Sequence, residues 1–358
     1  MTSLRSASFS GTEAPPPHLQ LDLDRLRGFL SQHLGQTLGA LSAVKFKGGQ
    51  SNPTYLITSV QGQWVLRRKP PGQLLASAHA IDREFRVMRA IWGTGVPVAQ
   101  PLLYCEDASV IGSDFYVAQY VQGRIFWDAE LPGMTPAHRT RLYDRMNEVL
   151  VRLHQSDVAA LGLSDFGRVG GYCARNLARW AKTYEQSRLA DIPDMDWLMD
   201  HLPKAVPAQE SVALLHGDFG LYNLIVHPSE PEISAVLDWE MATLGDPLVD
   251  LAHHLRAWWE IPDPQGSATS LADKDLAALG IPTMQAYLAR YFERLGQAAP
   301  DMTFYLAYAQ FRYAAMIQGI LKRVEQGTAA SGRRVHRQER VVQIAQMARR
   351  TLEGQARL

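Results

Sequence analysis

The stretch LLHGDFGLYNLIV, residues 214–226, places His216, Asp218 and Asn223 inside an otherwise apolar segment. A buried strand rarely carries such polar groups so close together, because each needs a hydrogen-bond partner once it leaves water. A second apolar segment follows and ends in Asp238, with two prolines in the turn between the segments. The pattern predicts a strand, a turn and a strand, which returns Asp238 to the neighbourhood of the first segment.

These four residues match the needs of phosphoryl transfer. The reaction requires a carboxylate that orients the attacking hydroxyl and accepts its proton, and oxygen ligands for a Mg²⁺ ion on the phosphates. We expect Asp218 to be the base, with Asn223 and Asp238 as the catalytic metal ligands. His216 is expected to support the loop by hydrogen bonds. The alternative is that Asp218 and Asn223 only cap a turn and Asp238 only ends a strand, but the H-x-D-x-x-x-x-N spacing followed by a second strand with Asp is more specific than that.

Composition excludes several classes of protein. The 358 residues carry a formal net charge of zero, which gives no support for a nucleic-acid partner or a membrane-surface partner. Cys105 and Cys173 form no C-x-x-C pair, which favours free thiols in a reducing compartment and hence a cytoplasmic protein. No apolar run reaches the roughly 18 residues that span a bilayer. Residues 1–18 lack the apolar core of a signal peptide and are predicted to be a mobile tail.

The remaining sequence predicts an α+β fold. Residues 43–69 alternate between apolar and polar positions around two turns and are typical of three strands, and residues 101–121 of two more. Between them, Ile81, Phe85 and Met88 recur at helical spacing. This predicts a five-stranded antiparallel sheet with one main helix. After Gly123 the chain is mostly helical, and a helix is predicted to begin at Thr135, which precedes a proline.

Five stretches together resemble a known group of enzymes. They are FKGGQSNPTYLI, LRRKPPG, DREFRVM, HGDFGLYNLIVHP and VLDWEMATLGDPLVDLA. They are similar to the aminoglycoside phosphotransferase and choline kinase group, and more narrowly to the kinase-like domain fused to some acyl-CoA dehydrogenases. The resemblance runs from about Leu23 to Val324. It implies a two-lobed, protein-kinase-like fold with ATP in the cleft, a nucleotide-binding lobe at 19–120 and a mostly helical lobe at 121–358.

The resemblance also implies where ATP contacts the small lobe. The loop in KGGQSNPTY would cover the phosphates, because glycines let backbone N–H groups approach them. Arg67 stands where relatives usually carry a phosphate-binding Lys, with Lys69 as the alternative, and Glu84 is its expected ion-pair partner. The lobe connector would bind adenine through the backbone of Gln119 to Val121. The loop residues expected to contact phosphate are Gly48, Gly49 and Ser51.

Other polar residues are assigned weaker roles. Asp246 and Asp250, in GDPLVDLA, are expected to brace the catalytic loop from a turn and a helix start. His253 and His254 are adjacent and point to different sides of a helix, so no site is predicted from the pair. For an anionic end of the substrate the candidates are Arg312, Lys322 and Arg323, with solvent exposure as the alternative for each.

The sequence therefore predicts an ATP- and Mg²⁺-dependent kinase acting on a small-molecule hydroxyl acceptor. The narrower resemblance implies a hydroxyacyl-CoA or hydroxy acid as acceptor and a separate acyl-CoA dehydrogenase as partner. An aminoglycoside- or choline-type kinase and a non-catalytic pseudokinase scaffold remain as alternatives, the latter because Arg67 replaces the usual Lys. A protein kinase is not favoured, because the loop lacks Arg after His216 and no A-P-E segment occurs.

Overall fold

A computed structural model of the chain describes residues 11–47, 52–70, 81–208, 211–262, 270–327 and 337–355. These residues divide into two units, and the chain passes between them three times. The first unit contains the described residues of Met1–Trp127 together with Leu221–Ala242, and the second contains those of Asp128–Gly220 and Thr243–Leu358. The segment Leu221–Ala242 returns to the first unit, so neither unit is a single continuous stretch of the chain.

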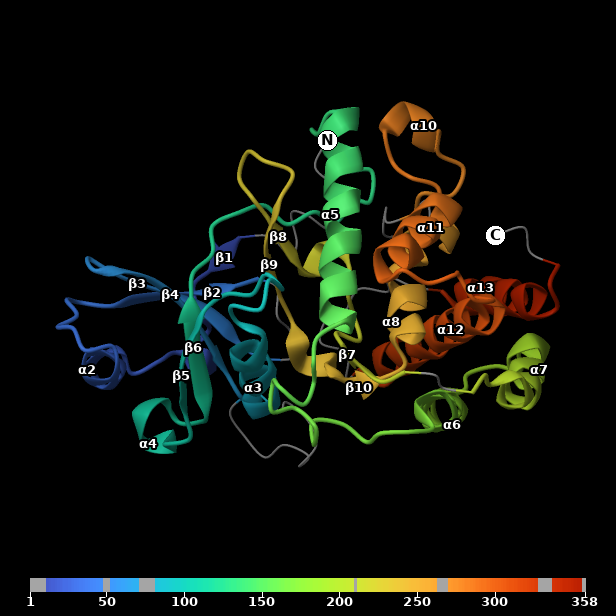
Figure 1. The fold of residues 1–358 in the computed structure, drawn as a ribbon. Helices are drawn as coiled ribbons and strands as arrows, with labels where there is room; N and C mark the ends of the chain where they lie inside the picture. The colour runs from blue at the N-terminus through green and yellow to red at the C-terminus, as the bar shows by residue number, and fades with distance from the viewer. Residues whose placement is uncertain are drawn as a thin grey trace. The chain divides into compact units, whose positions relative to one another are not determined.

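An antiparallel sheet forms the centre of the first unit (Figure 1). Its strand order is β1-β2-β3-β4-β6-β5, and consecutive strands along the chain mostly pair as hairpins. The strands are Thr12–Glu13 (β1), Ser42–Phe46 (β2), Thr54–Ser59 (β3), Gly62–Arg68 (β4), Pro101–Cys105 (β5) and Phe115–Gln119 (β6).

The sheet has six strands where the sequence predicts five. The extra strand is β1, whose Thr12 pairs with Phe46 and whose Glu13 pairs with Lys45. The helical turn Pro17–Leu19 (η1) follows it. The described part of the predicted mobile tail is therefore structured, because the edge of β2 offers backbone groups that a short strand can satisfy.

The two faces of the sheet follow the period-two alternation of its strands. One face packs on helix α2 (Leu23–His33), where Leu26 and Leu30 join a buried cluster with Leu66 of β4 and Val117 of β6. The intervening residues point the other way, toward helix α3 (Ile81–Ile91). This alternation places Arg67 opposite α3. A short helix, Ala108–Ile111 (α4), precedes β6.

The predicted hairpin after the catalytic loop is present in the first unit. Strands Leu224–Val226 (β8) and Ile233–Val236 (β9) pair antiparallel, between the short turns Leu221–Asn223 (η3) and Trp239–Met241 (η4). Arg124 exchanges backbone hydrogen bonds with Val226, and the Val236 N–H donates to Pro97 at 2.9 Å. These bonds tie the hairpin to the sheet unit.

The second unit is mostly helical (Figure 1). Its first long helix begins as predicted, with the Thr135 side chain accepting a hydrogen bond from the His138 N–H. Strands β7 (Ala213–Leu215) and β10 (Thr243–Gly245) pair antiparallel and form a two-stranded sheet in this unit. The helices are Pro136–His154 (α5), Tyr172–Ser187 (α6), Pro193–His201 (α7), Pro247–His254 (α8), Arg256–Trp259 (α9), Leu276–Leu279 (α10), Met284–Leu295 (α11), Thr303–Glu325 (α12) and Gln338–Leu352 (α13), with a helical turn at Leu202–Ala205 (η2).

Candidate active site

The loop that carries Asp218 is fixed by Asp250, one turn into α8. The two carboxylate oxygens of Asp250 accept hydrogen bonds from the backbone N–H groups of His216, at 2.7 Å, and Gly217, at 2.9 Å. The side chain of His154 lies 3.3 Å from the same carboxylate. Burial opposes the charge of Asp250, but these hydrogen bonds hold its pKa down, at about 2. The expected bracing role of Asp250 is confirmed by these contacts.

Asp246 caps the N-terminus of the same helix, α8. Its side chain accepts hydrogen bonds from the Leu248 N–H at 3.0 Å and from the Tyr305 hydroxyl at 3.0 Å. The first bond is a helix cap, and the second ties α8 to α12. Asp250 therefore holds the loop directly, whereas Asp246 fixes the start of the helix that carries Asp250.

Asp218 itself is oriented by His253. The Nε2 atom of His253 lies 2.9 Å from Oδ1 of Asp218, whose side chain is 32% exposed. Burial lowers the pKa of His253 and the charge of Arg312 lowers it further, while Asp218 raises it; the net shift is downward and favours the neutral imidazole. Since a carboxylate only accepts, Nε2 carries the proton and donates to Asp218.

The contact of His253 with Asp218 is a feature of the candidate site that the sequence analysis misses. A usable signal is its spacing: His253 follows Asp250 by three residues, which places both on one face of α8. Arg312 also lies at this loop, and its Nη2 donates to the Gly217 carbonyl at 2.9 Å. Of the three cations proposed for an anionic acceptor, Arg312 contacts the loop, whereas Lys322 pairs with Glu325.

The first unit contains the other expected site residues, among them Arg67, Glu84 and Asp238. Arg67 is buried and its guanidinium meets three carboxylates: Nε lies 3.0 Å from Glu84, while Nη2 lies 2.8 Å from Asp238 and 3.4 Å from Glu240. Burial disfavours the charge of Arg67, but the three acids raise its pKa above the ordinary value. The ion pair predicted between Arg67 and Glu84 is thus present.

Lys69 has a different partner. Its ammonium pairs with Asp114, just before the neighbouring strand β6. Lys69 lies beyond the end of β4, so it does not share the environment of Arg67. Of the two candidate cations, Arg67 and Lys69, the structure joins Arg67 to Glu84.

Asn223 and Asp238 stand at the paired ends of the β8–β9 hairpin. The Leu237 N–H donates to the Asn223 carbonyl at 2.8 Å, which places the two residues at the same end of the ladder. Asp238 has a left-handed backbone, with φ of 64° and ψ of 60°, a conformation that costs energy for a residue other than glycine. Its carboxylate is one third exposed.

This donor set suits Mg²⁺ chemically, because amide and carboxylate oxygens are the ligands that the ion prefers. Within the described ranges, no group of three or more His, Cys, Asp or Glu side chains has the arrangement of a metal site. A magnesium ion held by Asn223 and Asp238 would therefore depend on phosphate oxygens and water for its other ligands, which is usual for nucleotide-bound Mg²⁺.

The other predicted nucleotide contacts are only partly described. Gly48, Gly49 and Ser51 lie outside the described residues. Gln119 ends β6 opposite Trp64, and its N–H donates to the Gln100 carbonyl at 2.9 Å. Val121 follows in an irregular, half-buried segment.

The two units and their loops belong to a known enzyme family. Residues 42–305 match the model of the phosphotransferase enzyme family, so the chain is a member of it. The expected fold and the expected enzyme class, a phosphotransferase with an alcohol group as acceptor, are confirmed at the level of this family. A small-molecule kinase is thereby supported.

Individual relatives narrow the comparison. Mouse acyl-CoA dehydrogenase family member 10 is 44% identical over 307 residues, which cover 86% of this chain and 28% of that protein. Mouse family member 11 is 41% identical over 327 residues, covering 89% of this chain and 42% of the relative. The chain thus spans less than half the length of these relatives, as the narrower resemblance implies.

Solved structures agree with the fold. A protein from Ralstonia eutropha, provisionally named an aminoglycoside phosphotransferase, is 42% identical with a TM-score of 0.85, covering 94% of this chain and 99% of its own. A spectinomycin phosphotransferase, solved with ADP and spectinomycin, has a TM-score of 0.60 at 13% identity, covering 93% of this chain and 99% of its own. The second likeness shows the fold alone.

Over the part of the chain that the structure describes, we find no helix both long and apolar enough to cross a bilayer.

Proposed function

We propose that this protein is a cytoplasmic, ATP- and Mg²⁺-dependent kinase that phosphorylates the hydroxyl of a hydroxyacyl-CoA or hydroxy acid. The observation that carries the proposal is the fixed carboxylate of Asp218. It is partly exposed, a neutral His253 donates to one of its oxygens, and its loop is held by Asp250. A carboxylate so oriented, and not buried, is suited to accept a proton from a substrate hydroxyl.

The proposed reaction exchanges one P–O bond for another and moves one proton. The acceptor oxygen attacks the γ-phosphorus of ATP, the bond from that phosphorus to the β–γ bridging oxygen breaks, and ADP leaves with its electron pair. The hydroxyl proton passes to Asp218. His253 keeps the carboxylate aimed during this transfer, and it is therefore a positioning residue in the proposal.

The first unit would bind the nucleotide. Arg67 would meet the α- and β-phosphates, backbone groups of Gly48, Gly49 and Ser51 the other phosphate oxygens, and the backbone of Gln119 to Val121 adenine. Asn223 and Asp238 would hold Mg²⁺, which when bound neutralises charge on the phosphates. The contact of Arg67 with Asp238 supports this assignment, since it keeps the carboxylate charge compensated when the ion is absent.

Replacing Asp238 by Ala tests the metal assignment. Wild-type affinity for ATP should rise with added Mg²⁺ and fall with EDTA, and Asp238→Ala should lose most of this dependence because the carboxylate ligand is gone. Calorimetry with and without the ion measures it. A variant that keeps the wild-type dependence would make Asp238 a structural partner of Arg67 only.

The acceptor is inferred from the relatives and from chemistry. The 39–44% identical mammalian relatives are named acyl-CoA dehydrogenase family members, and this chain matches less than half of each. Phosphorylating a hydroxyl turns a poor leaving group into a good one, so a kinase acting beside a separate acyl-CoA dehydrogenase would prepare a hydroxyacyl group for elimination. Arg312, which contacts the catalytic loop, is the candidate for an anionic end of the acceptor.

The second candidate function is an aminoglycoside kinase, which the name of the Ralstonia eutropha structure favours. ADP release with a 4-hydroxyacyl-CoA, kanamycin and choline as alternative acceptors separates the two. We expect turnover with the acyl-CoA. Turnover of kanamycin or choline with none of the acyl-CoA would contradict the proposed acceptor, and no turnover of any acceptor, with ATP still bound, would favour a pseudokinase.

A further inference from the structure

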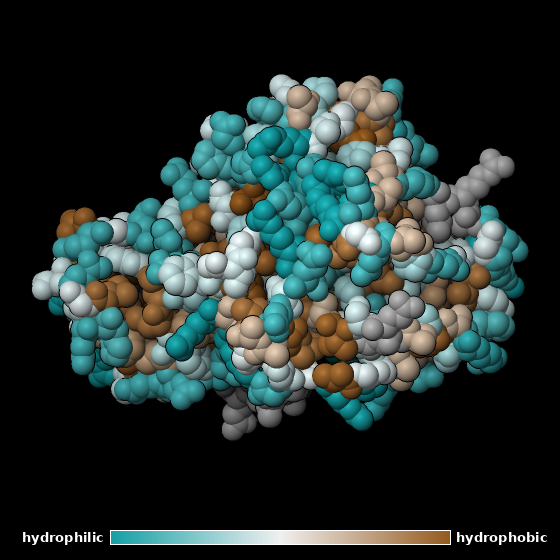
Figure 2. Space-filling model, in the orientation of Figure 1, coloured by the Kyte–Doolittle hydropathy of each residue, from teal (hydrophilic) through white to brown (hydrophobic). Residues whose placement is uncertain are grey.

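A cavity of about 380 Å³ lies in the second unit between α5, α10 and α11. Its lining includes the buried side chains of Tyr143, Asn147, Ile281 and Tyr287. Leu276 and Ala286 also line it and are more exposed. On the face drawn in Figure 2, hydrophobic residues reach the surface beside α10. A void of about 150 Å³ is enough to hold benzene, so this cavity has room for a two-ring aromatic or a comparable aliphatic group.

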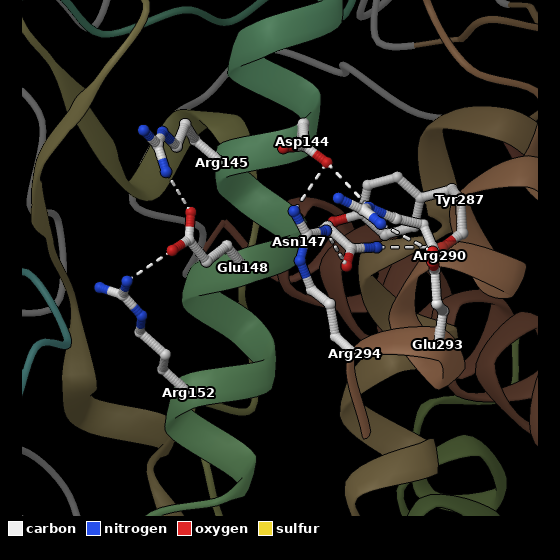
Figure 3. Close-up of polar contacts among 9 residues, drawn as sticks. All are labelled: Asp144, Arg145, Asn147, Glu148, Arg152, Tyr287, Arg290, Glu293 and Arg294. Carbon is white, nitrogen blue, oxygen red and sulfur yellow. Dashed lines mark hydrogen bonds and ion pairs between the residues drawn. The ribbon is translucent and has the colours of Figure 1, made fainter. Parts of the chain in front are cut away.

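The charged side chains around this cavity compensate one another. Figure 3 shows Asp144 and Asn147 pointing from α5 toward α11, where Arg290 and Arg294 meet them. Asp144 Oδ1 accepts from Arg294 at 2.7 Å and from Arg290 at 3.4 Å, and Arg290 also pairs with Glu293 at 2.7 Å. Two cations thus face two anions. A charged ligand would have to break an existing pair to be neutralised, which favours an uncharged one.

Most polar atoms of the lining are already engaged. The Asn147 amide donates to the Tyr287 carbonyl at 2.9 Å and accepts from Arg294 at 2.7 Å, and the Tyr143 hydroxyl donates to the Ala129 carbonyl at 2.7 Å. The Oδ2 atom of Asp144 makes no hydrogen bond to another residue that the structure describes, so it is available to accept one from a ligand. The lining is therefore mostly apolar or already hydrogen-bonded, and Asp144 Oδ2 is an acceptor that a hydroxyl could use, which suits an apolar molecule with a hydroxyl.

Tyr287 connects this cavity to the loop of Asp218. Its hydroxyl lies 2.8 Å from Nε2 of His254, whose Nδ1 lies 3.3 Å from the Phe219 carbonyl. A carbonyl only accepts, so Nδ1 carries the proton, and Nε2 accepts from the tyrosine. Phe219 follows Asp218 directly. One wall of the cavity is thus two hydrogen bonds from the residue next to the proposed base.

We infer that the cavity between α5, α10 and α11 is a binding site for an uncharged, mainly apolar molecule with a hydroxyl group, and that its occupancy is sensed by the 216–219 loop through Tyr287 and His254. Binding does not depend on the proposed kinase function, whereas any effect on phosphoryl transfer does.

Calorimetry with three naphthalene probes tests the ligand class on the intact chain. Naphthalene-2-methanol is neutral, 2-naphthoate is anionic and naphthalen-2-ylmethylammonium is cationic. We expect the alcohol to bind, and each charged probe to bind at least about tenfold more weakly, a difference of about 1.4 kcal/mol. An alcohol that gives no binding heat up to its solubility limit, or binds no better than the ions, overturns the inference.

Two substitutions on α11 locate the site. Ala286→Phe adds a ring at the cavity lining, while Ala289→Phe adds the same ring at an exposed position of the helix that does not line it. We expect Ala286→Phe to weaken binding of the alcohol at least about tenfold and Ala289→Phe to leave it unchanged. Equal effects of both substitutions, or none, would place binding elsewhere and contradict the site.

Hydrogen exchange tests the connection to the loop. We expect naphthalene-2-methanol to slow exchange of backbone amides in the 216–219 loop of the wild type, because a held Tyr287 ring holds His254 and Phe219. Tyr287→Phe keeps the ring and should bind the probe without slowing the loop. No change in the wild-type loop on saturation, or the same slowing in Tyr287→Phe, would contradict the connection. This readout is independent of phosphoryl transfer.

Discussion

The guanidinium of Arg67 can bind several carboxylates at once in a geometry that a lysine ammonium cannot match. Arg67 uses separate nitrogens for Glu84 and for the pair Asp238 and Glu240, a pattern that fits the planar fork of five donors. Glu84 is buried, and burial raises its pKa to about 7 although the charge of Arg67 lowers it. Arg67 therefore compensates a buried carboxylate of the first unit, whatever it does for the nucleotide.

Substitutions at Arg67 separate these roles. Arg67→Ala should destabilise the protein by about 3–5 kcal/mol, because it leaves Glu84 buried and unpaired. Arg67→Lys should restore most of this stability and retain more ATP affinity than the alanine variant. Urea unfolding and ATP calorimetry measure both effects.

Lys69→Ala is the matched control. Lys69 and Asp114 are each about 30% exposed, so losing their ion pair should cost less than about 1 kcal/mol. If Lys69→Ala impairs ATP binding more than Arg67→Ala does, the phosphate-binding cation has been placed two residues too early.

His253 offers a test of orientation at the base. His253→Phe removes the donor to Asp218 and should lower kcat up to about 100-fold, the cost of a misplaced reacting group, while the KM for ATP stays unchanged. His253→Gln carries an N–H donor and should recover part of kcat. A merely structural His253 would instead lower the folded fraction and leave kcat per folded molecule intact.

At the level of elements, the sequence predicts most of the architecture. Period-two and period-3.6 patterns identify β3 and α3, because one face of each element is buried. Strand β6 is buried on both faces over most of its length and shows as a short apolar run instead. The two-residue strand β1 has no measurable period and is missed. Its pairing is decided by the free edge of β2.

The residues of the candidate site can be predicted only where they lie close together in the sequence. Asp218 and Asn223 share one short loop, so their spacing carries the signal. The donation from His253 to Asp218, by contrast, depends on how α8 packs behind the loop. Glu240 contacts Arg67 although the two residues are 173 positions apart in the sequence, so no local sequence pattern predicts this contact.

The packing of α8 predicts a pH dependence of stability. Burial lowers the pKa of His254 to about 4, against about 6.5 in the unfolded chain. The unfolded state therefore binds more protons between these values, so stability is fully present above pH 6.5 and is lost as the pH falls toward 4. One proton gives a slope of about 1.4 kcal/mol per pH unit.

His254→Phe checks this sign. The variant keeps a ring beside Phe219 and Tyr287 but cannot be protonated, so its free energy of unfolding should fall less steeply from pH 6.5 to 4. Urea unfolding at several pH values measures the slope. Equal slopes for the two proteins would show that His254 is not buried in its neutral form.

At the scale of the whole molecule, the proposed chemistry is shared between the two units. The chain passes from the second unit to the first after Gly220, so one loop gives Asp218 to the second unit and Asn223 to the first. The hairpin then adds Asp238 to the first unit. Each unit therefore carries some of the proposed site residues, and residues 220 and 221 join the two sets covalently.

The central claim is that Asp218 is the base of an ATP-dependent phosphoryl transfer. Its direct test is transfer of the γ-phosphoryl group from labelled ATP to a 4-hydroxyacyl-CoA by the wild type and by Asp218→Asn. The Asn carbonyl can still accept from His253, so the loop geometry should persist while the capacity to take a proton is lost. We predict transfer by the wild type, loss of at least about 100-fold in kcat for the variant, and unchanged ATP affinity. A variant that keeps most of its kcat would contradict the account.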